Sequence, residues 1–336
     1  MKVRFFDPGK EYLKIRDEVL PEIDRVLTAG DLILRNDLEV FEENFAKLVG
    51  TKYAVGVASG TDALILSLKA LGIGQGDEVL APSYTFRATI EAICHTGATP
   101  ILYDLDGKFT LTNNTKAIVP AYIAGDVDIN ESIFPIFKNN GMFVVEDFCQ
   151  AITAAPARGD SACYSFYPAK ILGCYGDGGA IATNDEWLAQ KLKLARNHFK
   201  GDWKPIGYNS RLDNLQAAVL NVKLRHLTQN LARRREIALK YSKFLPTKLK
   251  VPKARKIYQD YIVECRSEEE RDNLYDFLMK NGIETMKNGY PFPIAFPKLP
   301  QALRYELCSL RIPCNPVLTD KEVDFVIKNV KEFYKK

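Results

Sequence analysis

The sequence predicts an α/β protein with a mostly parallel central sheet, helices on both of its faces, and a smaller C-terminal α+β domain. Three observations support this fold class. The chain has 336 residues, enough for one large domain and a smaller one. Short apolar runs alternate with helical stretches through its first half, which is typical of a largely parallel sheet. A long helical segment then precedes a shorter mixture of strands and helices.

Two amphipathic helices open the chain. Apolar residues recur at helical spacing from Tyr12 to Leu27 and from Leu38 to Leu48, and each series stops at a glycine, Gly30 or Gly50. Further helices are expected from Thr61 and over Phe86–Thr96. We expect strands over these apolar runs: Tyr53–Ala58, Glu78–Ala81, Pro100–Tyr103, Ala117–Ile123, Met142–Val145, Ala162–Phe166 and Gly179–Thr183.

A helix over Asp213–Phe244 carries an apolar stripe and is expected to link two domains. We therefore divide the chain into a large domain, 1–230, and a small C-terminal domain, 231–336. In the second we expect a strand over Asp260–Cys265 and helices over Glu268–Lys280 and Asp320–Tyr334. The prolines of Tyr290–Pro300 predict a loop.

Composition excludes several classes of protein. The formal net charge of +4 is spread along the chain, which argues against nucleic acid as the main partner. No run is long and apolar enough to span a membrane, and the N-terminus lacks the apolar core of a secretory signal. The seven cysteines contain no CxxC pair, and the three histidines lie far apart. We expect reduced thiols, no metal site and a cytoplasmic protein.

The first candidate site is the segment Ser59-Gly60-Thr61, which follows a strand and opens a helix. Free backbone N–H groups and the positive end of the helix dipole meet there, and Gly60 allows close approach. These features suit a phosphate. Ordinary N-capping by Ser59 or Thr61 explains the same residues.

The second candidate is the apolar strand that ends in Glu146 and Asp147, followed by Gln150. In open α/β sheets ligands bind beyond the carboxyl ends of the strands, so an acid there can face the site. Because successive residues of a strand point to opposite faces, only one of the two acids need do so. A helix cap or a surface acid is the competing interpretation.

The third candidate is Lys170, between a strand and the glycine-rich run Gly173–Gly179. Taken alone, a lysine is most often a solvated surface group. Together the three candidates supply what pyridoxal phosphate needs. These are a phosphate cup, an acid that keeps the pyridine nitrogen protonated, and a lysine that forms the Schiff base.

The chain resembles the DegT/DnrJ/EryC1/StrS family of sugar aminotransferases over nearly its whole length. Six ordered motifs carry the resemblance: SGTDAL (Ser59–Leu64), PSYTFRAT (Pro82–Thr89), ED-x-x-QA (Glu146–Ala151), SFYPAK (Ser165–Lys170), GDGGAI (Gly176–Ile181) and GYNSRLDNLQAA (Gly207–Ala218). The resemblance implies the type I, aspartate-aminotransferase-like fold, a homodimer with active sites at the interface, and glutamate or glutamine as amino donor.

The same resemblance implies a role for each matching residue. Lys170 would bind pyridoxal 5'-phosphate and move the proton in catalysis, and Asp147 would hold the pyridine nitrogen. Gln150 would bind the phenolic oxygen. The remaining expected cofactor-binding residues are Gly60, Thr61 and Ser165 at the phosphate, Phe86 stacked on the ring, and Asn209 reaching the phosphate from the partner subunit.

The implied reaction is amination of a nucleotide-linked keto-sugar. The forms of Gly207–Asp213 and Leu172–Gly179 resemble those of enzymes that aminate a 3-keto sugar, so we favour that position. A 4-keto-sugar aminotransferase and a non-catalytic regulatory protein that binds pyridoxal phosphate remain the alternatives. A dinucleotide-binding dehydrogenase would need an early GxGxxG motif, which the sequence lacks.

Three residues depart from the family pattern: Arg35 in place of glycine, Tyr122 in place of histidine, and Gly289 in place of histidine. They lie near loops expected to shape the sugar pocket, so they leave the substrate's identity open. Arg35 either contacts an anionic group of the substrate or meets only water. Arg211 either binds an anion or forms a structural ion pair.

Overall fold

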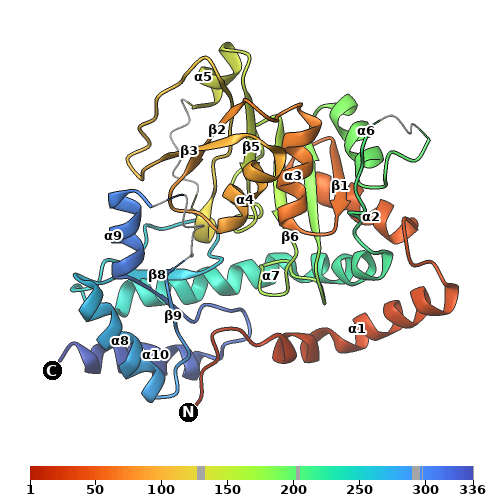
Figure 1. Cartoon of the computed structure of the whole chain (residues 1–336). Helices are drawn as coiled ribbons and strands as arrows, with labels where there is room; N and C mark the ends of the chain where they lie inside the picture. The colour runs from red at the N-terminus through yellow and green to blue at the C-terminus, as the bar shows by residue number, and fades with distance from the viewer. Residues whose placement is uncertain (127–132, 202–204, 290–295, 297, 336) are drawn as a thin grey trace.

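The computed structural model describes residues 1–126, 133–201, 205–289, 296 and 298–335 (Figure 1). Most predicted elements are present with small shifts at their ends. The helices are α1 (Pro8–Ala29), α2 (Asn36–Val49), α3 (Gly60–Ala70), α4 (Arg87–Thr96), α5 (Ile133–Asn139), α6 (Glu186–Ala195), α7 (Asn214–Phe244), α8 (Glu268–Lys280), α9 (Pro300–Cys308) and α10 (Asp320–Phe333). The strands are β1 (Tyr53–Val57), β2 (Glu78–Pro82), β3 (Thr99–Tyr103), β4 (Thr115–Ile118), β5 (Phe143–Asp147), β6 (Ser161–Ser165), β7 (Gly179–Thr183), β8 (Tyr261–Glu264), β9 (Met286–Lys287) and β10 (Ser309–Ile312).

The central sheet is mostly parallel, as predicted. Among the described residues it has seven strands in the order β1-β7-β6-β5-β4-β2-β3, and β7 is antiparallel to both of its neighbours. The strand predicted over Ala117–Ile123 was wrong in extent. It covers Thr115–Ile118, and residues Ile123–Gly125 form a short 3-10 turn in which Ala124 has a φ of 56°.

Helices cover both faces of this sheet because its strands are apolar on both sides. On one face, Phe45 of α2 packs edge to face on Tyr164 of β6 and on Phe166, the residue after this strand. On the other face, Cys163 and Ile181 belong to a separate core that includes residues of α3, α4 and α6. Alternate residues of one strand thus serve two cores, as the two-residue period of a strand requires.

The long helix α7 runs from the central sheet to the small C-terminal sheet, β8-β10-β9 (Figure 1). Ala217 and Leu220 near its start belong to the core beside the central sheet. Ile237 and Tyr241 near its end belong to the core of the C-terminal part. We propose that the two domains divide near residue 230, within this helix.

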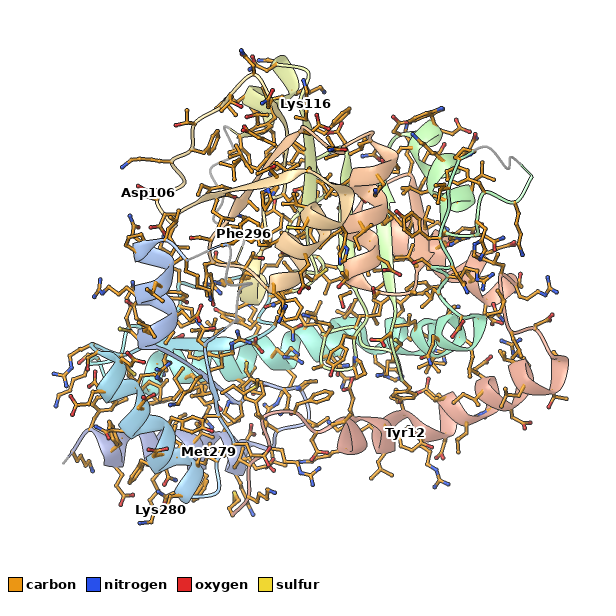
Figure 2. All side chains as sticks on the ribbon, in the orientation of Figure 1. Tyr12, Asp106, Lys116, Met279, Lys280 and Phe296 are labelled. Carbon is orange, nitrogen blue, oxygen red and sulfur yellow. The ribbon has the colours of Figure 1, made fainter. Side chains whose placement is uncertain are left out.

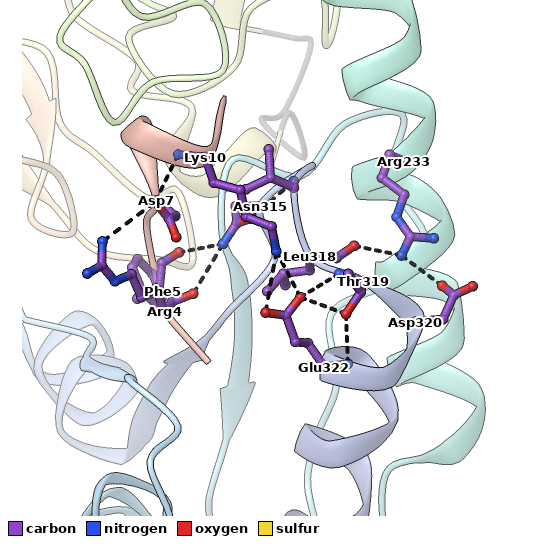
Figure 3. Close-up of polar contacts among 11 residues, drawn as sticks. Arg4, Phe5, Asp7, Lys10, Arg233, Asn315, Leu318, Thr319, Asp320 and Glu322 are labelled. Carbon is purple, nitrogen blue, oxygen red and sulfur yellow. Dashed lines mark hydrogen bonds and ion pairs between the residues drawn. The ribbon is translucent and has the colours of Figure 1, made fainter. Parts of the chain in front are cut away.

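The N-terminal segment is attached to the C-terminal part of the chain (Figure 3). Val3 N donates to Gly282 O at 2.8 Å, and Asn315 Nδ2 donates to the carbonyls of Arg4 and Phe5 at 3.2 and 3.1 Å. The Asp7 side chain then caps α1 by accepting a hydrogen bond from Lys10 N. These contacts place the residues before α1 beside the small domain.

Helix α1 lies along α7 and carries Tyr12 (Figure 2). The Tyr12 ring packs edge to face on Tyr175, with 5.9 Å between ring centroids. No helix in the described part of the chain is both long and apolar enough to cross a membrane. Of the predicted proline-rich loop, residues 290–295 and 297 lie outside the described residues, and Pro300 begins α9 instead.

Candidate active site

A cavity of about 510 Å³ opens where the central sheet meets the small domain. One wall comes from segments that follow the carboxyl ends of β1, β5 and β6, where α/β sheets bind ligands. Most of the predicted site residues line it: Gly60, Thr61, Phe86, Asp147, Gln150, Ser165 and Lys170. Residues separated by more than 100 positions in the chain therefore share one chamber.

The segment predicted to form a phosphate cup is tightly packed. Ser59 caps α3, because its Oγ accepts a hydrogen bond from Asp62 N at 3.0 Å, and it also lines the cavity. A Cβ on Gly60 would lie 2.7 Å from Ser165 Cβ and 2.9 Å from Cys149 Sγ. The cap uses only one backbone N–H of the helix start, and Ser59, Gly60 and Thr61 all line the cavity, so capping does not exclude the predicted phosphate cup.

The two adjacent acids at the end of β5 have different surroundings. Glu146 lies outside the cavity lining, where its carboxylate accepts hydrogen bonds from Tyr122 Oη at 2.6 Å and from the backbone N of Arg158 and Gly159. Burial raises the pKa of Glu146, and these hydrogen bonds oppose the rise. Asp147 lines the cavity and is held by Thr89 Oγ1, which donates to Oδ2 at 2.8 Å. Only Asp147 is therefore placed to meet a ligand.

Lys170 projects into the cavity. Its Nζ forms no hydrogen bond or ion pair with any residue of the described chain. Burial lowers the pKa of this amine, while the charges of Cys149, Asp260 and Asp147 act to raise it and Arg311 acts to lower it further. Such an amine is more often neutral, and so more nucleophilic, than a surface lysine.

The remaining predicted residues are placed differently from one another. Phe86 precedes α4 and is 46% exposed, so it is not a core aromatic. Gln150 is buried and its Oε1 accepts a hydrogen bond from Ala124 N at 3.1 Å. Asn209 is exposed and does not line the cavity of its own chain; it forms a β-bridge with Asn197.

Two residues that depart from the family pattern, Arg35 and Tyr122, and the motif residue Arg211 have partners within the chain. Arg35 forms an exposed ion pair with Asp31, with 3.2 Å between nitrogen and oxygen. Arg211 Nη1 donates to Asn197 Oδ1 at 3.0 Å. Tyr122 lines the cavity while its hydroxyl is engaged by Glu146, so this tyrosine presents mainly its ring.

The small domain forms a second wall that we did not predict. It contributes Gln259, Asp260, Arg311 and Asn315, together with Arg234 from α7. Asp260 and Arg311 form a buried ion pair with 3.3 Å between Nη1 and Oδ2. The sequence did contain one signal for this pair. Each of the two charged residues lies within or beside a short apolar strand, and a charged side chain there needs a partner if the strand is buried.

Comparison with known proteins identifies the family of this chain. The sequence model of the DegT/DnrJ/EryC1/StrS aminotransferase family matches residues 13–331. The chain belongs to this family. The predicted aminotransferase class and its pyridoxal phosphate cofactor are thereby confirmed.

Two relatives and one solved structure illustrate the range of this aminotransferase family. A pleiotropic regulatory protein of Geobacillus stearothermophilus is 33% identical over 100% of this chain and 99% of its own length. A UDP-N-acetyl-3-dehydro-alpha-D-glucosamine 3-aminotransferase of Acidithiobacillus ferrooxidans is 37% identical over 85% of this chain and 83% of its own.

The solved structure is that of Streptomyces venezuelae DesV in complex with a ketimine intermediate. DesV is 34% identical in sequence to the present chain, with a TM-score of 0.92. The match covers 100% of the present chain and 99% of the DesV chain. This likeness confirms the predicted fold class, the type I aminotransferase fold.

Proposed function

We propose that this protein transfers an amino group from glutamate to the 3-keto carbon of a nucleotide-linked sugar, with pyridoxal phosphate carried on Lys170. The observation that carries the proposal is the convergence of Lys170, Asp147 and the start of α3 on one cavity. Each of the three is common in proteins, but a cavity that joins all three suits this cofactor in particular.

The described residues fit pyridoxal phosphate in shape as well as in chemistry. A side chain at position 60 would collide with Ser165, so glycine lets the start of α3 lie beside Ser165, and both residues line the cavity where the phosphate would bind. Asp147 retains lone pairs beyond those used by Thr89 and by Cys149 N. Lys170 Nζ is uncommitted within the described chain.

Pyridoxal phosphate supplies an electron sink that stabilises negative charge on the carbon next to the reacting nitrogen. The Asp147 carboxylate would hold the proton on the pyridine nitrogen, and Gln150 would donate a hydrogen bond to the phenolic oxygen. Phe86 would cover one face of the ring. Lys170 Nζ, once released from the cofactor, would carry the proton between the two carbon atoms that exchange it.

Among the described residues, three basic ones, Lys170, Arg234 and Arg311, and three acids, Asp147, Asp177 and Asp260, line the cavity, so a particular cation rather than the net charge supports an anionic substrate. Arg234 and Arg311 both line it, and Arg234 forms no ion pair with a carboxylate in the described part of the chain. Glutamate and a nucleotide-linked sugar are both anions, and glutamine carries an anionic carboxylate. The relative named as a 3-aminotransferase, together with the motifs Gly207–Asp213 and Leu172–Gly179, favours amination at position 3.

We propose further that the protein acts as a homodimer in the cytoplasm. Asn209 would reach the phosphate of the partner subunit, which accounts for its exposed position away from its own cavity. All seven cysteines are free thiols, as is usual in a reducing compartment.

The decisive experiment starts from the purified protein loaded with pyridoxal phosphate. Glutamate should convert the bound cofactor to its amino form, with loss of the visible absorbance band. A nucleotide-linked 3-keto sugar should then restore the band. Restoration by a 4-keto sugar together with failure of every 3-keto sugar tried would refute the 3-position, and a Lys170→Ala variant with full activity would refute the whole proposal.

A regulatory role is the second candidate, because one relative that covers the whole chain is named a pleiotropic regulatory protein. A regulator without turnover would still show the visible absorbance band of the bound cofactor. Its band would not respond to glutamate. The same titration therefore separates the two candidates.

A further inference from the structure

The direction of the Lys170 side chain depends on how the chain around it is held. Lys170 lies in the loop after β6, and its backbone N donates to Tyr167 O at 2.8 Å. Its own Nζ has no hydrogen-bond or ion-pair partner in the described chain. The two peptide groups on either side of Lys170 must therefore set the position of Nζ.

Gln259 of the small domain binds both of these peptide groups. Its Oε1 accepts a hydrogen bond from Ile171 N at 3.0 Å, and its Nε2 donates to Ala169 O at 2.9 Å. Ala169 O belongs to the peptide group before Lys170, and Ile171 N belongs to the one after it. A single amide thus fixes the planes of both flanking peptides, which leaves the Lys170 backbone little freedom to turn.

Gln259 is itself held firmly. Gln259 is buried, with only 7% of its surface exposed. Its backbone carbonyl accepts a hydrogen bond from Arg234 Nη1 at 3.0 Å, and the same nitrogen also donates to Cys314 O at 2.9 Å. The clamp on Lys170 therefore connects through α7 to the core of the small domain.

We infer that Gln259 is a positioning residue, which holds the Lys170 backbone so that Nζ reaches the cofactor and the reacting carbon. This inference rests on the proposed role of Lys170. It assigns to the small domain a direct part in aligning the lysine of the large domain. Misplacement of a reacting group by about 1 Å costs on the order of 100-fold in rate, so the clamp should matter for turnover.

The chain contains a matched control for this residue. Gln216 of α7 binds the backbone of Tyr175 in the same loop region, with Oε1 accepting from Tyr175 N at 2.9 Å and Nε2 donating to Tyr175 O at 3.2 Å. The side chain and the kind of contact are the same as at Gln259. Gln216 does not line the cavity and does not touch the peptides beside Lys170.

The test compares Gln259→Leu, Gln259→Glu and Gln216→Leu as holoenzymes with the wild-type protein. For each we would measure kcat, KM for glutamate, the thermal unfolding midpoint, and the pH midpoint of the visible absorbance of the bound cofactor. We expect Gln259→Leu to lower kcat by about 10- to 100-fold. We also expect a shift of about 1 pH unit in the absorbance midpoint, a tenfold change in proton affinity.

Gln216→Leu should lose thermal stability to a similar degree while kcat and the absorbance midpoint stay within about twofold and 0.2 pH unit of wild type, because none of its contacts reaches Lys170. In Gln259→Glu the carboxylate can still accept from Ile171 N but cannot donate to Ala169 O. Its defect should therefore diminish as the pH falls and the new carboxyl group becomes protonated.

The inference is overturned if Gln259→Leu and Gln216→Leu behave alike in kcat and absorbance midpoint. If Gln259→Leu does not fold, Gln259→Glu decides alone, and a defect that does not change with pH overturns the inference. A wild-type protein without the visible band would refute the proposed function instead, and would remove the basis of this inference with it.

Discussion

Replacement of Gly60 by alanine tests whether the close contact between α3 and β6 forms the phosphate cup. The new methyl group would lie 2.7 Å from Ser165 Cβ and 2.9 Å from Cys149 Sγ, whereas carbon atoms in good contact lie about 3.5–4.0 Å apart. A new rotamer can move the Cys149 sulfur. It cannot move Ser165 Cβ, whose position follows from the backbone of β6, so the start of α3 must shift.

The expected magnitude follows from this geometry. Overpacking of this kind costs about 1–3 kcal/mol, and the better helix propensity of alanine recovers at most about 1 kcal/mol. We expect the free energy of unfolding of Gly60→Ala to fall by about 1–2 kcal/mol. A shifted helix start also moves its N–H groups away from Ser165, so the Kd for pyridoxal phosphate should rise about tenfold or more, which corresponds to about 1.4 kcal/mol.

Urea denaturation of the apoprotein and absorbance titration with the cofactor would measure the two quantities. Gly9→Ala is the control, because Gly9 also lies in the first turn of a helix and its added Cβ would meet only Asp7 Oδ1, at 3.8 Å. That variant should keep its cofactor affinity and lose no stability. If Gly60→Ala matches Gly9→Ala in both measurements, the contact with β6 does not form the cup.

Two further predictions concern the charges around the site. Asp260→Asn should lower the pKa of Lys170 and Arg311→Met should raise it, because the first removes a nearby negative charge and the second a positive one. The pH dependence of the rate at which the apoprotein takes up pyridoxal phosphate reports this pKa. A shift of the pKa in the same direction in both variants would contradict the reasoning. Tyr122→Phe removes a hydrogen bond that opposes the raised pKa of Glu146, so the folded-state pKa should move further above the value of 4.5 expected when unfolded. The loss of stability, about 1–3 kcal/mol, should then be largest above that folded pKa and should shrink as the pH falls toward 4.5. Urea denaturation at several pH values would measure this loss. A loss of the same size at every pH would contradict the reasoning.

Much of the fold was predictable because it depends on local patterns. Short apolar runs separated by helical stretches predicted the positions of β1, β5 and β6 and of the helices α3 and α4. The strand predicted over Ala117–Ile123 ends at Ile118 instead, shortly before Pro120, which has no backbone N–H to donate to a neighbouring strand. Helix α9 (Pro300–Cys308) was not predicted, and only its first residue, Pro300, lay in the predicted loop; proline is well tolerated in the first turn of a helix.

The large-domain side of the site was predictable for a related reason. Segments that follow parallel strands meet at one edge of the sheet, so Gly60, Asp147 and Lys170 had to converge once the strands were recognised. The structure was needed to decide which of Glu146 and Asp147 faces the cavity. Strand periodicity places the two side chains on opposite faces of the sheet, but it does not say on which face the ligand binds.

The chain's motifs alone were enough to predict the chemistry: a lysine, an acid and a phosphate cup at strand ends, within an aminotransferase family. The folded structure was needed for the opposite wall, where Gln259 reaches the peptides beside Lys170 across some 90 positions and Asp260 pairs with Arg311. Local periodicity describes how a segment meets its immediate neighbours along the chain. It carries no information about which distant side chains become buried together, because that depends on how the two domains pack.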